Sequence, residues 1–235
     1  MRLIDNIDEA TKFLERSRIT ESYDSNPKIM ERLGIIFGEN LTVAQAVSRI
    51  LGDIREQGDK ALYDYAKRID GFEQINLEVT SEERDNALDR IPVDVVESLE
   101  FASNRIREYQ LLSLDNATKD FCHNGLGQKV TSLDKVGLYV PGGTAVYPST
   151  VLMTAIPARV AGVNEIILST PPGPNGRIST VVLAAAAIAQ VDRIFKIGGA
   201  QAIGAMAYGT ETVPAVDKIF GPGNVFVQTA KRMVF

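Results

Sequence analysis

Apolar residues in the first half of the chain recur at helical spacing. Four segments place them at i, i+3 and i+4, the repeat that gathers side chains on one face of a helix. These segments are Asp8–Arg18, Val43–Gln57, Lys60–Ile69 and Val93–Leu114. Thr42 can cap the start of the second segment, Gly58 can end it, and Pro92 suits the first turn of the last. Residues 1–117 are therefore predicted to form a mainly helical N-terminal region.

The pattern changes in residues 118–135, which are predicted to be a hairpin connector. The runs Thr118–His123 and Gln128–Leu133 flank the dipeptide Asn124-Gly125. Asn-Gly is typical of a two-residue hairpin turn, because both turn positions need a positive φ. A small β-hairpin is therefore expected to join the two halves of the chain.

From residue 136 onward, short apolar runs alternate with glycine or proline turns and with helical segments. The predicted strands are Gly137–Val140, Glu165–Ser169, Arg193–Ile197 and Asp217–Phe220. The predicted helices are Ser149–Ala161, Thr180–Gln190, Ala200–Tyr208 and one that begins near Asn224. This alternation predicts βαβ units and a parallel sheet covered on both faces. The expected fold is α/β: a Rossmann-like parallel sheet with flanking helices over residues 136–235, preceded by the helical region and the hairpin.

Composition and charge exclude several classes of protein. The 30 acidic and 25 basic side chains give a net charge of -5, which argues against a nucleic-acid partner. The single cysteine, Cys122, cannot form an intrachain disulfide. The N-terminus is acidic and amphipathic, unlike a signal peptide, and no apolar run approaches the ~20 residues that span a bilayer. A cytoplasmic protein without a membrane partner is expected.

Three glycine-rich turns stand where a predicted strand hands over to a helix. They are Pro141-Gly142-Gly143, Gly198-Gly199-Ala200-Gln201 and Gly221-Pro222-Gly223-Asn224. In an open α/β sheet this is the carboxyl edge, where ligands bind, and glycine lets a cofactor approach the backbone closely. None of the turns matches G-x-G-x-x-G or the phosphate-binding P-loop. A single such turn is often only a tight connection, but three at one edge favour a binding site.

Each turn also brings one polar side chain suited to orienting a ligand. Tyr139 stands just before the first turn and offers a ring and a hydroxyl. Gln201 and Asn224 are expected in the first turns of their helices, and their amides can both donate and accept hydrogen bonds. The residues alone leave a second interpretation open, namely a packed tyrosine and two helix-capping amides.

The pattern predicts no metal site and no catalytic residue in this chain. His123, the only histidine, adjoins Cys122, but neighbouring strand residues point to opposite faces and cannot easily chelate one ion. No zinc-binding spacing such as C-x-x-C or H-E-x-x-H occurs, and no G-x-S-x-G motif indicates a serine hydrolase.

The chain resembles histidinol dehydrogenase over roughly residues 42–235. The match is carried by VGLYVPGGTAVYPSTVLMTAIPARVAG (136–162), the two prolines at 171–172, IGGAQAIGAMAYGTETVPAVDKIFGPGN (197–224) and FVQTAKRMV (226–234). A weaker match is VAQAVSRILGDIREQGDKALYDYAKRIDG (43–71). The resemblance implies a zinc- and NAD-dependent enzyme, a homodimer of Rossmann-like domains. It would oxidise L-histidinol to L-histidine through an aldehyde, in two hydride transfers, with Tyr139, Gln201 and Asn224 as NAD contacts.

The same resemblance implies that half of the enzyme is missing. The zinc ligands, the Glu-His acid/base pair and the substrate-contacting serine of the family all lie beyond GPGN and match nothing here. The chain also ends at Lys231–Phe235 without a glycine cap or a polar tail, which is typical of a truncated helix. A fragment that is inactive alone and keeps weak NAD affinity is therefore expected.

Two other interpretations stay open at this point. Family relatives oxidise other small alcohols, such as sulfonated diols, and share a similar cofactor-side sequence. A non-catalytic nucleotide-binding module that has lost its second half is the other alternative.

Overall fold

The computed structural model of the chain describes residues 4–14, 26–71, 76–142 and 145–235. Internal contacts divide the chain into two compact units, Met1–Ala46 and Val47–Phe235. The predicted division at residues 117 and 135 follows secondary structure instead, and stays a prediction.

The first unit contains α1 (Ile7–Leu14), α3 (Pro27–Phe37) and the start of α4 (Val43–Gln57). The predicted helix Asp8–Arg18 overlaps α1, while residues 15–18 lie outside the described residues. The spacing of apolar residues did not predict helix α3. It begins after Asn26, whose side chain accepts a hydrogen bond from the Lys28 N–H, and it ends at Gly38 with φ of 74°.

Helix α4 begins and ends as predicted. The Thr42 hydroxyl accepts a hydrogen bond of 3.2 Å from the Gln45 N–H, and the Gln45 side chain accepts one of 2.9 Å from the Thr42 N–H. This reciprocal pair is a capping box. Gly58, with φ of 54°, follows the last helical residue. The predicted apolar stripe is buried, as Val47, Ile50, Leu51 and Ile54 show.

The second unit continues with helices that precede the sheet. Helix α5 (Asp59–Tyr65) runs directly into a π-helical turn (Ala66–Asp70). Then come α6 (Ser81–Asp85), a 3-10 turn (Leu88–Arg90) and the long α7 (Val93–Asp115). Helix α7 matches its predicted range, whereas α6 was not predicted.

The predicted hairpin is confirmed at its turn. Strands β1 (Phe121–His123) and β2 (Leu126–Gln128) pair antiparallel, with His123 opposite Leu126. Asn124 and Gly125 have φ of 50° and 82°, the values that a two-residue turn requires. The second strand starts earlier than predicted, because such a turn leaves no further residue between the strands.

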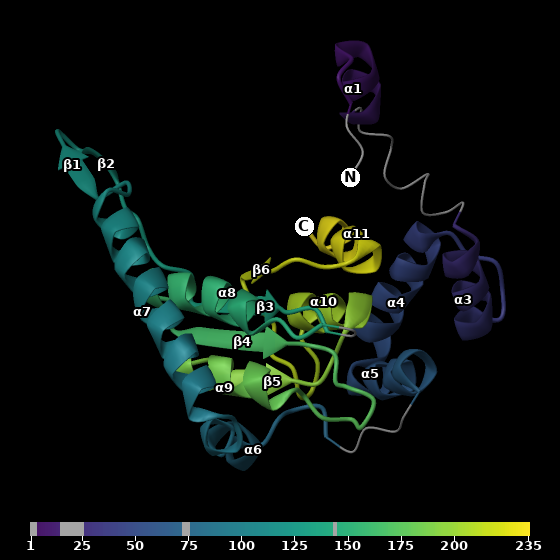
Figure 1. The fold of residues 1–235 in the computed structure, drawn as a ribbon. Coiled ribbons are helices and arrows are strands. Elements are labelled where there is room, and N and C mark those ends of the chain that lie inside the picture. The colour runs from purple at the N-terminus through teal and green to yellow at the C-terminus, as the bar shows by residue number, and fades with distance from the viewer. Residues whose placement is uncertain (1–3, 15–25, 72–75, 143–144) are drawn as a thin grey trace. The chain divides into compact units, whose positions relative to one another are not determined.

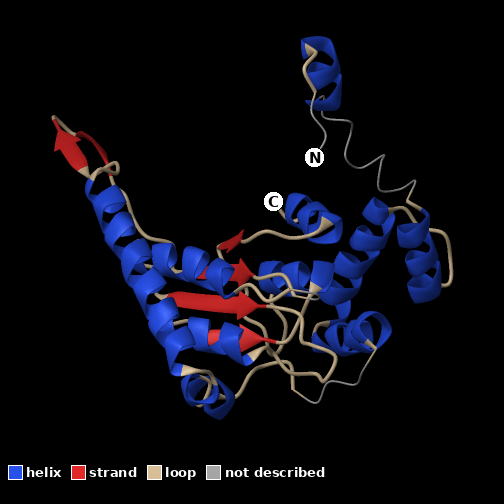
Figure 2. Ribbon diagram, viewed as in Figure 1, coloured by secondary structure: helices blue, strands red, loops and turns tan. Residues whose placement is uncertain are grey.

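Residues 135–235 form a four-stranded parallel sheet with helices on both faces (Figures 1 and 2). In chain order the elements are β3 (Lys135–Tyr139), α8 (Pro148–Val160), β4 (Glu165–Ser169), α9 (Thr180–Ile188), β5 (Arg193–Phe195), α10 (Gly199–Tyr208), β6 (Lys218–Phe220) and α11 (Val225–Met233). All four predicted strands and all four predicted helices are present, with ends that differ by a few residues. None of the helices in the described parts of the chain is long and apolar enough to cross a bilayer.

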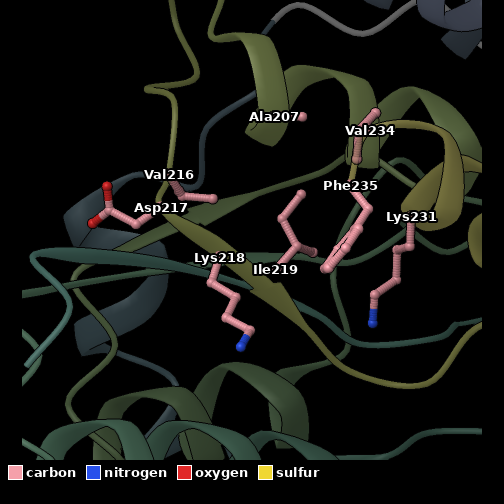
Figure 3. A pocket seen from close by; sticks show the side chains of 8 residues that line it. All are labelled: Ala207, Val216, Asp217, Lys218, Ile219, Lys231, Val234 and Phe235. Atoms are coloured by element: carbon pink, nitrogen blue, oxygen red, sulfur yellow. The ribbon is translucent and has the colours of Figure 1, made fainter.

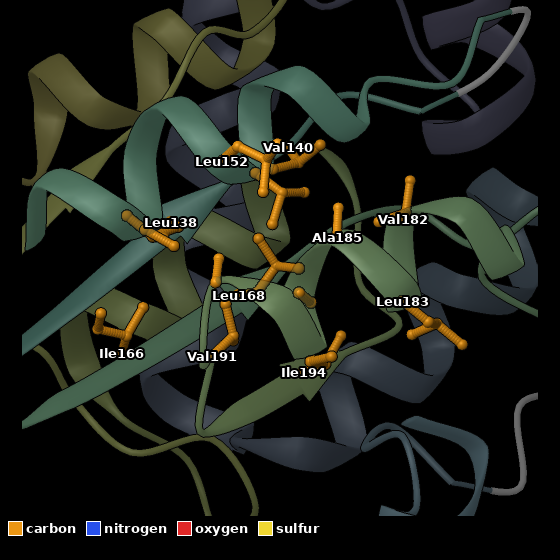
Figure 4. Packing of buried hydrophobic residues seen from close by; sticks show 14 of the residues in the cluster. Leu138, Val140, Leu152, Ile166, Leu168, Val182, Leu183, Ala185, Val191 and Ile194 are labelled. Carbon is orange, nitrogen blue, oxygen red and sulfur yellow. The ribbon is translucent and has the colours of Figure 1, made fainter. Parts of the chain in front are cut away.

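Alternate strand residues serve the two faces of the sheet. Leu138, Val140, Ile166 and Leu168 pack with side chains of α8 and α9 in one apolar cluster (Figure 4). Gly137 faces the other side, where an added Cβ would lie 2.7 Å from the sulfur of Met206 on α10. Helix α10 therefore covers the face opposite to α8 and α9.

The order of the strands creates a switch point. Neighbouring strands run β5-β4-β3-β6, so the chain moves from β3 to β4 to β5 and then returns past β3 to place β6 on its other side. The crossovers from β3 to β4 and from β4 to β5 thus run to one side of β3, whereas the crossover from β5 leads to β6 on the other side. Ligands of open α/β sheets bind outside the carboxyl ends of the strands at such a point.

Candidate cofactor-binding site

The glycine turns predicted from the sequence meet at the carboxyl edge of the sheet. Pro141-Gly142 follows β3, Gly198-Gly199 follows β5, and Gly221–Asn224 follows β6. The strands are parallel, so all of these turns lie at one edge (Figure 1). Gly143, the last residue of the first turn, lies outside the described residues.

Close backbone contacts explain why glycine occupies these turns. Gly221 has φ of 112°, and a Cβ there would lie 2.0 Å from the carbonyl oxygen of Tyr139. A Cβ on Gly142 or on Gly198 would lie 2.6 Å from the side chain of Pro171, which follows β4. The turns after β3, β4 and β5 thus touch one another through Pro171, and side chains at these glycines would force them apart.

Tyr139 connects two of the turns. Its ring is 3% exposed at the end of β3, so it is packed and does not offer an open stacking surface. Its hydroxyl accepts a hydrogen bond of 3.0 Å from the Gly199 N–H. Burial raises the pKa of this hydroxyl, the Gly199 N–H opposes that rise, and the negative charge of Asp70 adds to it. The hydroxyl is therefore neutral at physiological pH and still has a hydrogen to donate.

Gln201 is the most unusual polar residue of the site. It stands in the first turn of α10 and is only 2% exposed. Its Oε1 has no hydrogen-bond partner among the described residues. An added Cβ on Gly199 would lie 2.6 Å from this oxygen, which places the oxygen against the turn after β5. A buried acceptor without a donor costs free energy, and native proteins rarely keep one without a functional reason.

Asn224 caps α11 at the switch point. Its Oδ1 accepts hydrogen bonds of 3.1 Å from the N–H groups of both Phe226 and Val227. The capping interpretation is thus correct for this oxygen. The capping bonds leave the NH₂ group of the exposed side chain able to donate to a ligand.

Lys231 is a member of the site that sequence reasoning did not select. Its ammonium group donates a hydrogen bond of 3.1 Å to the carbonyl oxygen of Gly221, and burial lowers its pKa. Through this hydrogen bond, Lys231 on α11 anchors the glycine turn that follows β6. No spacing rule links Lys231 to Gly221, so only the folded geometry identifies this contact.

A cavity of about 380 Å³ lies between β6 and α11 (Figure 3). Its lining is Ala207, Val216, Asp217, Lys218, Ile219, Lys231, Val234 and Phe235. Lys231, which lines this cavity, also donates a hydrogen bond to Gly221 in the turn after β6. Tyr139, Gln201 and Asn224 do not line it, so this cavity is separate from the three predicted contacts.

Within the described ranges, no three His, Cys, Asp or Glu side chains are grouped closely enough to hold a metal ion. Cys122 and His123 both lie exposed on the hairpin. The carboxyl edge instead offers hydroxyl, amide and backbone N–H groups around a close-packed set of turns. Such groups can bind ribose hydroxyls and phosphate oxygens of a nucleotide.

Comparisons with known proteins identify the family of this chain. The family model described as histidinol dehydrogenase matches residues 38–235. Histidinol dehydrogenase of Oceanobacillus iheyensis is 51% identical over 201 residues, which are 83% of this chain and 46% of that enzyme. The enzyme of Dehalococcoides mccartyi is 47% identical over 97% of this chain and 49% of its own length. The crystal structure of histidinol dehydrogenase from Elizabethkingia anophelis superposes with a TM-score of 0.76 at 32% identity, covering 89% of this chain and 49% of that one. The chain thus spans about half the length of the relatives it matches.

Proposed function

Because this chain belongs to the histidinol dehydrogenase family, we propose that it is the NAD-binding part of an enzyme that oxidises L-histidinol to L-histidine. The family match, the identity to curated relatives and the structural likeness support this proposal. The chain corresponds to about half of those relatives, so the complete reaction belongs to a larger protein.

The observation that carries the proposal is the Oε1 of Gln201, which has no hydrogen-bond partner among the residues that the structure describes. It lies buried beside the Gly199 turn, whose N–H is bonded to the Tyr139 hydroxyl. A ligand hydroxyl or amide at this edge would supply the missing donor. NAD carries ribose hydroxyls and a carboxamide, and it therefore fits this requirement.

Three side chains would share the binding of NAD. Tyr139 would donate its hydroxyl hydrogen, since that oxygen already accepts from Gly199. Gln201 would accept through Oε1, and Asn224 would donate through its NH₂ group while its oxygen caps α11. When bound, NAD accepts hydride from the substrate. The contribution of this chain is to orient the cofactor against the closely packed glycine turns.

The zinc of the family does not fit the residues described here, since no group of potential ligands is present among them. We infer that the metal and the acid/base residues are supplied by the part of the family protein that this chain does not match. This chain alone is then expected to bind NAD weakly and to produce no NADH from L-histidinol.

Calorimetric titration of the 235-residue chain with NAD tests the proposal, together with an assay of NADH formation from L-histidinol and zinc. Saturable NAD binding without turnover is expected. Failure to bind NAD would overturn the assignment of the cofactor site. Turnover by this chain would overturn the inference that catalysis needs further residues.

We also propose that the complete protein is a cytoplasmic homodimer, as the family resemblance implies. Exposed apolar side chains on α7 and the hairpin support a further interface, notably Phe101, Tyr109, Leu112, Phe121 and Leu126. Exposed apolar patches mark interaction surfaces or lead to association. Sedimentation velocity checks this point, and a monodisperse monomer at all concentrations would contradict it for this chain.

A further inference from the structure

Strand β6 is the least buried strand of the four-stranded sheet. Every residue of β3 and β4 after the first is buried, and so are the last two residues of β5, whereas β6 has no buried residue. In the part of the chain that the structure describes, β6 pairs with β3 alone, and it lies at the margin of the sheet (Figure 1). An open edge of this kind is a template for pairing with a further strand.

The opposite edge of the sheet is covered by the chain itself. Glu78 and Phe195 of β5 form an antiparallel bridge. Next to this bridge, the Val79 N–H donates a hydrogen bond of 2.8 Å to the carbonyl oxygen of Ile194. Among the described residues, no comparable segment runs beside β6, so the two edges of the sheet differ.

The backbone of β6 directs hydrogen-bonding groups to its open edge. The Asp217 N–H donates a bond of 2.9 Å to the carbonyl oxygen of Lys135, at the start of β3. Successive residues of a strand in a parallel pair face alternately toward and away from the partner strand. The N–H and C=O groups of Ile219 therefore face β3, whereas those of Lys218 and Phe220 point to the open edge. No turn or loop in the described ranges bonds the backbone groups of these two residues.

Apolar cavities lie on both faces of β6. Ile219 lines the cavity of about 380 Å³ between β6 and α11, together with Val216 and Val234 (Figure 3). Phe220 lines a second cavity of about 640 Å³ between β6, α8 and the end of α7, together with Met153. A strand beside β6 would direct its side chains alternately to these two faces. Apolar side chains on such a strand would therefore fill both cavities.

The order of the strands indicates which kind of strand belongs at this edge. The order β5-β4-β3-β6 is the order 3-2-1-4 of a Rossmann sheet, in which a fifth parallel strand lies beside the fourth. The matched residues cover 46% of the Oceanobacillus iheyensis enzyme and 49% of the Elizabethkingia anophelis enzyme. Members of the family therefore have enough further chain to supply this strand.

A second copy of this chain does not fit the same edge. In a two-fold interface both copies present the same surface. Two β6 strands would then meet with the cavities of one copy facing the cavities of the other, and neither pair would be filled. Close packing requires protruding side chains opposite the cavities. A different segment is therefore the better occupant.

We propose that the open edge of β6 binds an extended apolar segment from the part of the histidinol dehydrogenase family protein that this chain does not match, as a fifth parallel strand. The backbone groups of Lys218 and Phe220 would pair with that segment, and its alternate side chains would occupy the two cavities. The proposal rests on the family match and on the sheet, and it does not depend on NAD binding. Because β6 continues into the turn Gly221–Asn224, the added strand would also support that turn.

The test uses overlapping peptides from the unmatched part of the Oceanobacillus iheyensis enzyme, each of about 10 residues, the upper length of an ordinary strand. Each peptide carries a fluorophore, and fluorescence anisotropy follows its binding to the 235-residue chain. One stretch of overlapping peptides with alternating apolar residues should bind saturably. Hydrogen exchange measured by NMR should then show new protection of the Lys218 and Phe220 amides. The Ile219 amide, which already faces β3, should change little.

A pair of variants at Lys218 tests the backbone contact. Lys218→Pro removes an N–H group from the open edge and no bond to β3, an orientation in which edge strands tolerate proline. It should weaken peptide binding about tenfold, the scale of one hydrogen bond. Lys218→Ala also removes the side chain but keeps the N–H group, so its affinity should equal that of the unchanged chain. Thermal unfolding of both variants checks that the fold is retained.

Several outcomes would overturn the proposal. One is that no peptide protects the amides of Lys218 and Phe220, and another is that the proline and alanine variants bind equally well. Self-association that protects these two amides, detected by sedimentation, would make a second copy the occupant. If Lys218→Pro unfolds, the protection pattern of the unchanged chain decides the question.

Discussion

The hydroxyl of Tyr139 and the backbone N–H of Gly199 are joined by a hydrogen bond of 3.0 Å across 60 positions of sequence. The bond links the end of β3 to the first residue of α10. These are the two places where the cofactor is expected to touch the sheet. A side chain that binds a ligand thus also aligns the backbone of the neighbouring turn.

Tyr139→Phe is expected to weaken NAD binding about tenfold, since it removes one hydrogen bond to the ligand. It also leaves the Gly199 N–H without its acceptor, so the free energy of unfolding should fall by about 1 kcal/mol. Calorimetry and urea unfolding measure the two effects. Tyr208→Phe makes the same substitution at the other end of α10 and should change neither quantity. NAD affinity unaltered by the Tyr139 change would exclude the hydroxyl as a contact.

Gln201→Met is expected to change the stability of the chain and its NAD affinity in opposite directions. It replaces an amide whose Oε1 has no partner among the described residues by an apolar side chain of similar volume, so the chain without ligand should gain about 1 kcal/mol. NAD affinity should fall, because Oε1 no longer accepts from the cofactor. Thermal unfolding with and without NAD measures both, and Gln57→Met at an exposed position is the matched control. A less stable free chain would show that Oε1 is satisfied without a ligand.

Asn224 allows capping to be separated from ligand contact. Asn224→Asp keeps the oxygen that accepts from Phe226 and Val227, so the melting temperature should be maintained. It removes the NH₂ donor, so NAD affinity should drop. Asn224→Ala removes both and should also cost about 1 kcal/mol of stability. Asn26→Ala, at the cap of α3, is the control that should leave NAD affinity intact. Equal NAD affinity in the aspartate variant would mean that Asn224 acts only as a cap.

The carboxyl group of Glu83 on α6 makes the free energy of unfolding depend on pH in the acid range. Burial alone would raise its pKa, but the Thr80 N–H and the Lys196 ammonium group at 3.1 Å outweigh this and lower it. A carboxylate with a lowered folded-state pKa stabilises the fold above its unfolded pKa, and that stability is lost as pH falls through the folded pKa. The loss should begin below about pH 5, near the unfolded value of ~4.3.

The check is the urea midpoint measured from neutral to acid pH. Glu83→Gln should be less stable than the unchanged chain at neutral pH, and its urea midpoint should fall less steeply as the pH is lowered. The exposed neighbour Glu82 provides the control Glu82→Gln. If the urea midpoints of Glu83→Gln and of the unchanged chain fell equally steeply with decreasing pH, Glu83 would not be the source of this pH dependence.

Sequence periodicity predicted most of the helices and missed two. The stripe of α4 and the Asn-Gly turn of the hairpin were both identified because their signals are local. Helix α6 has 5 residues, too few for a clear apolar repeat, whereas α3 has 11 and was missed although it is longer than several predicted helices. Both nevertheless carry cap signals, Asn26-Pro27 before α3 and the Thr80–Glu83 capping box at α6. These caps are local sequence signals for the starts of both helices.

The sequence alone predicted only part of the candidate site. Tyr139, Gln201 and Asn224 were selected because each adjoins a strand end, and the fold brings their turns to one edge. The structure adds that Tyr139 is packed and that the oxygen of Asn224 is a cap. Lys231 carries no distinguishing local signal, because its contact with Gly221 arises only when α11 folds back on the turn.

The sequence by itself predicts the three glycine turns, because the alternation of apolar runs, glycines and helical segments is a local property of the chain. Only the tertiary structure decided which strands are neighbours and hence that β3 and β6 enclose the switch point. It also enclosed the start of α10, which leaves the Gln201 Oε1 buried with no donor among the described residues. These relationships depend on contacts between segments far apart in the chain, and no local spacing rule specifies such contacts.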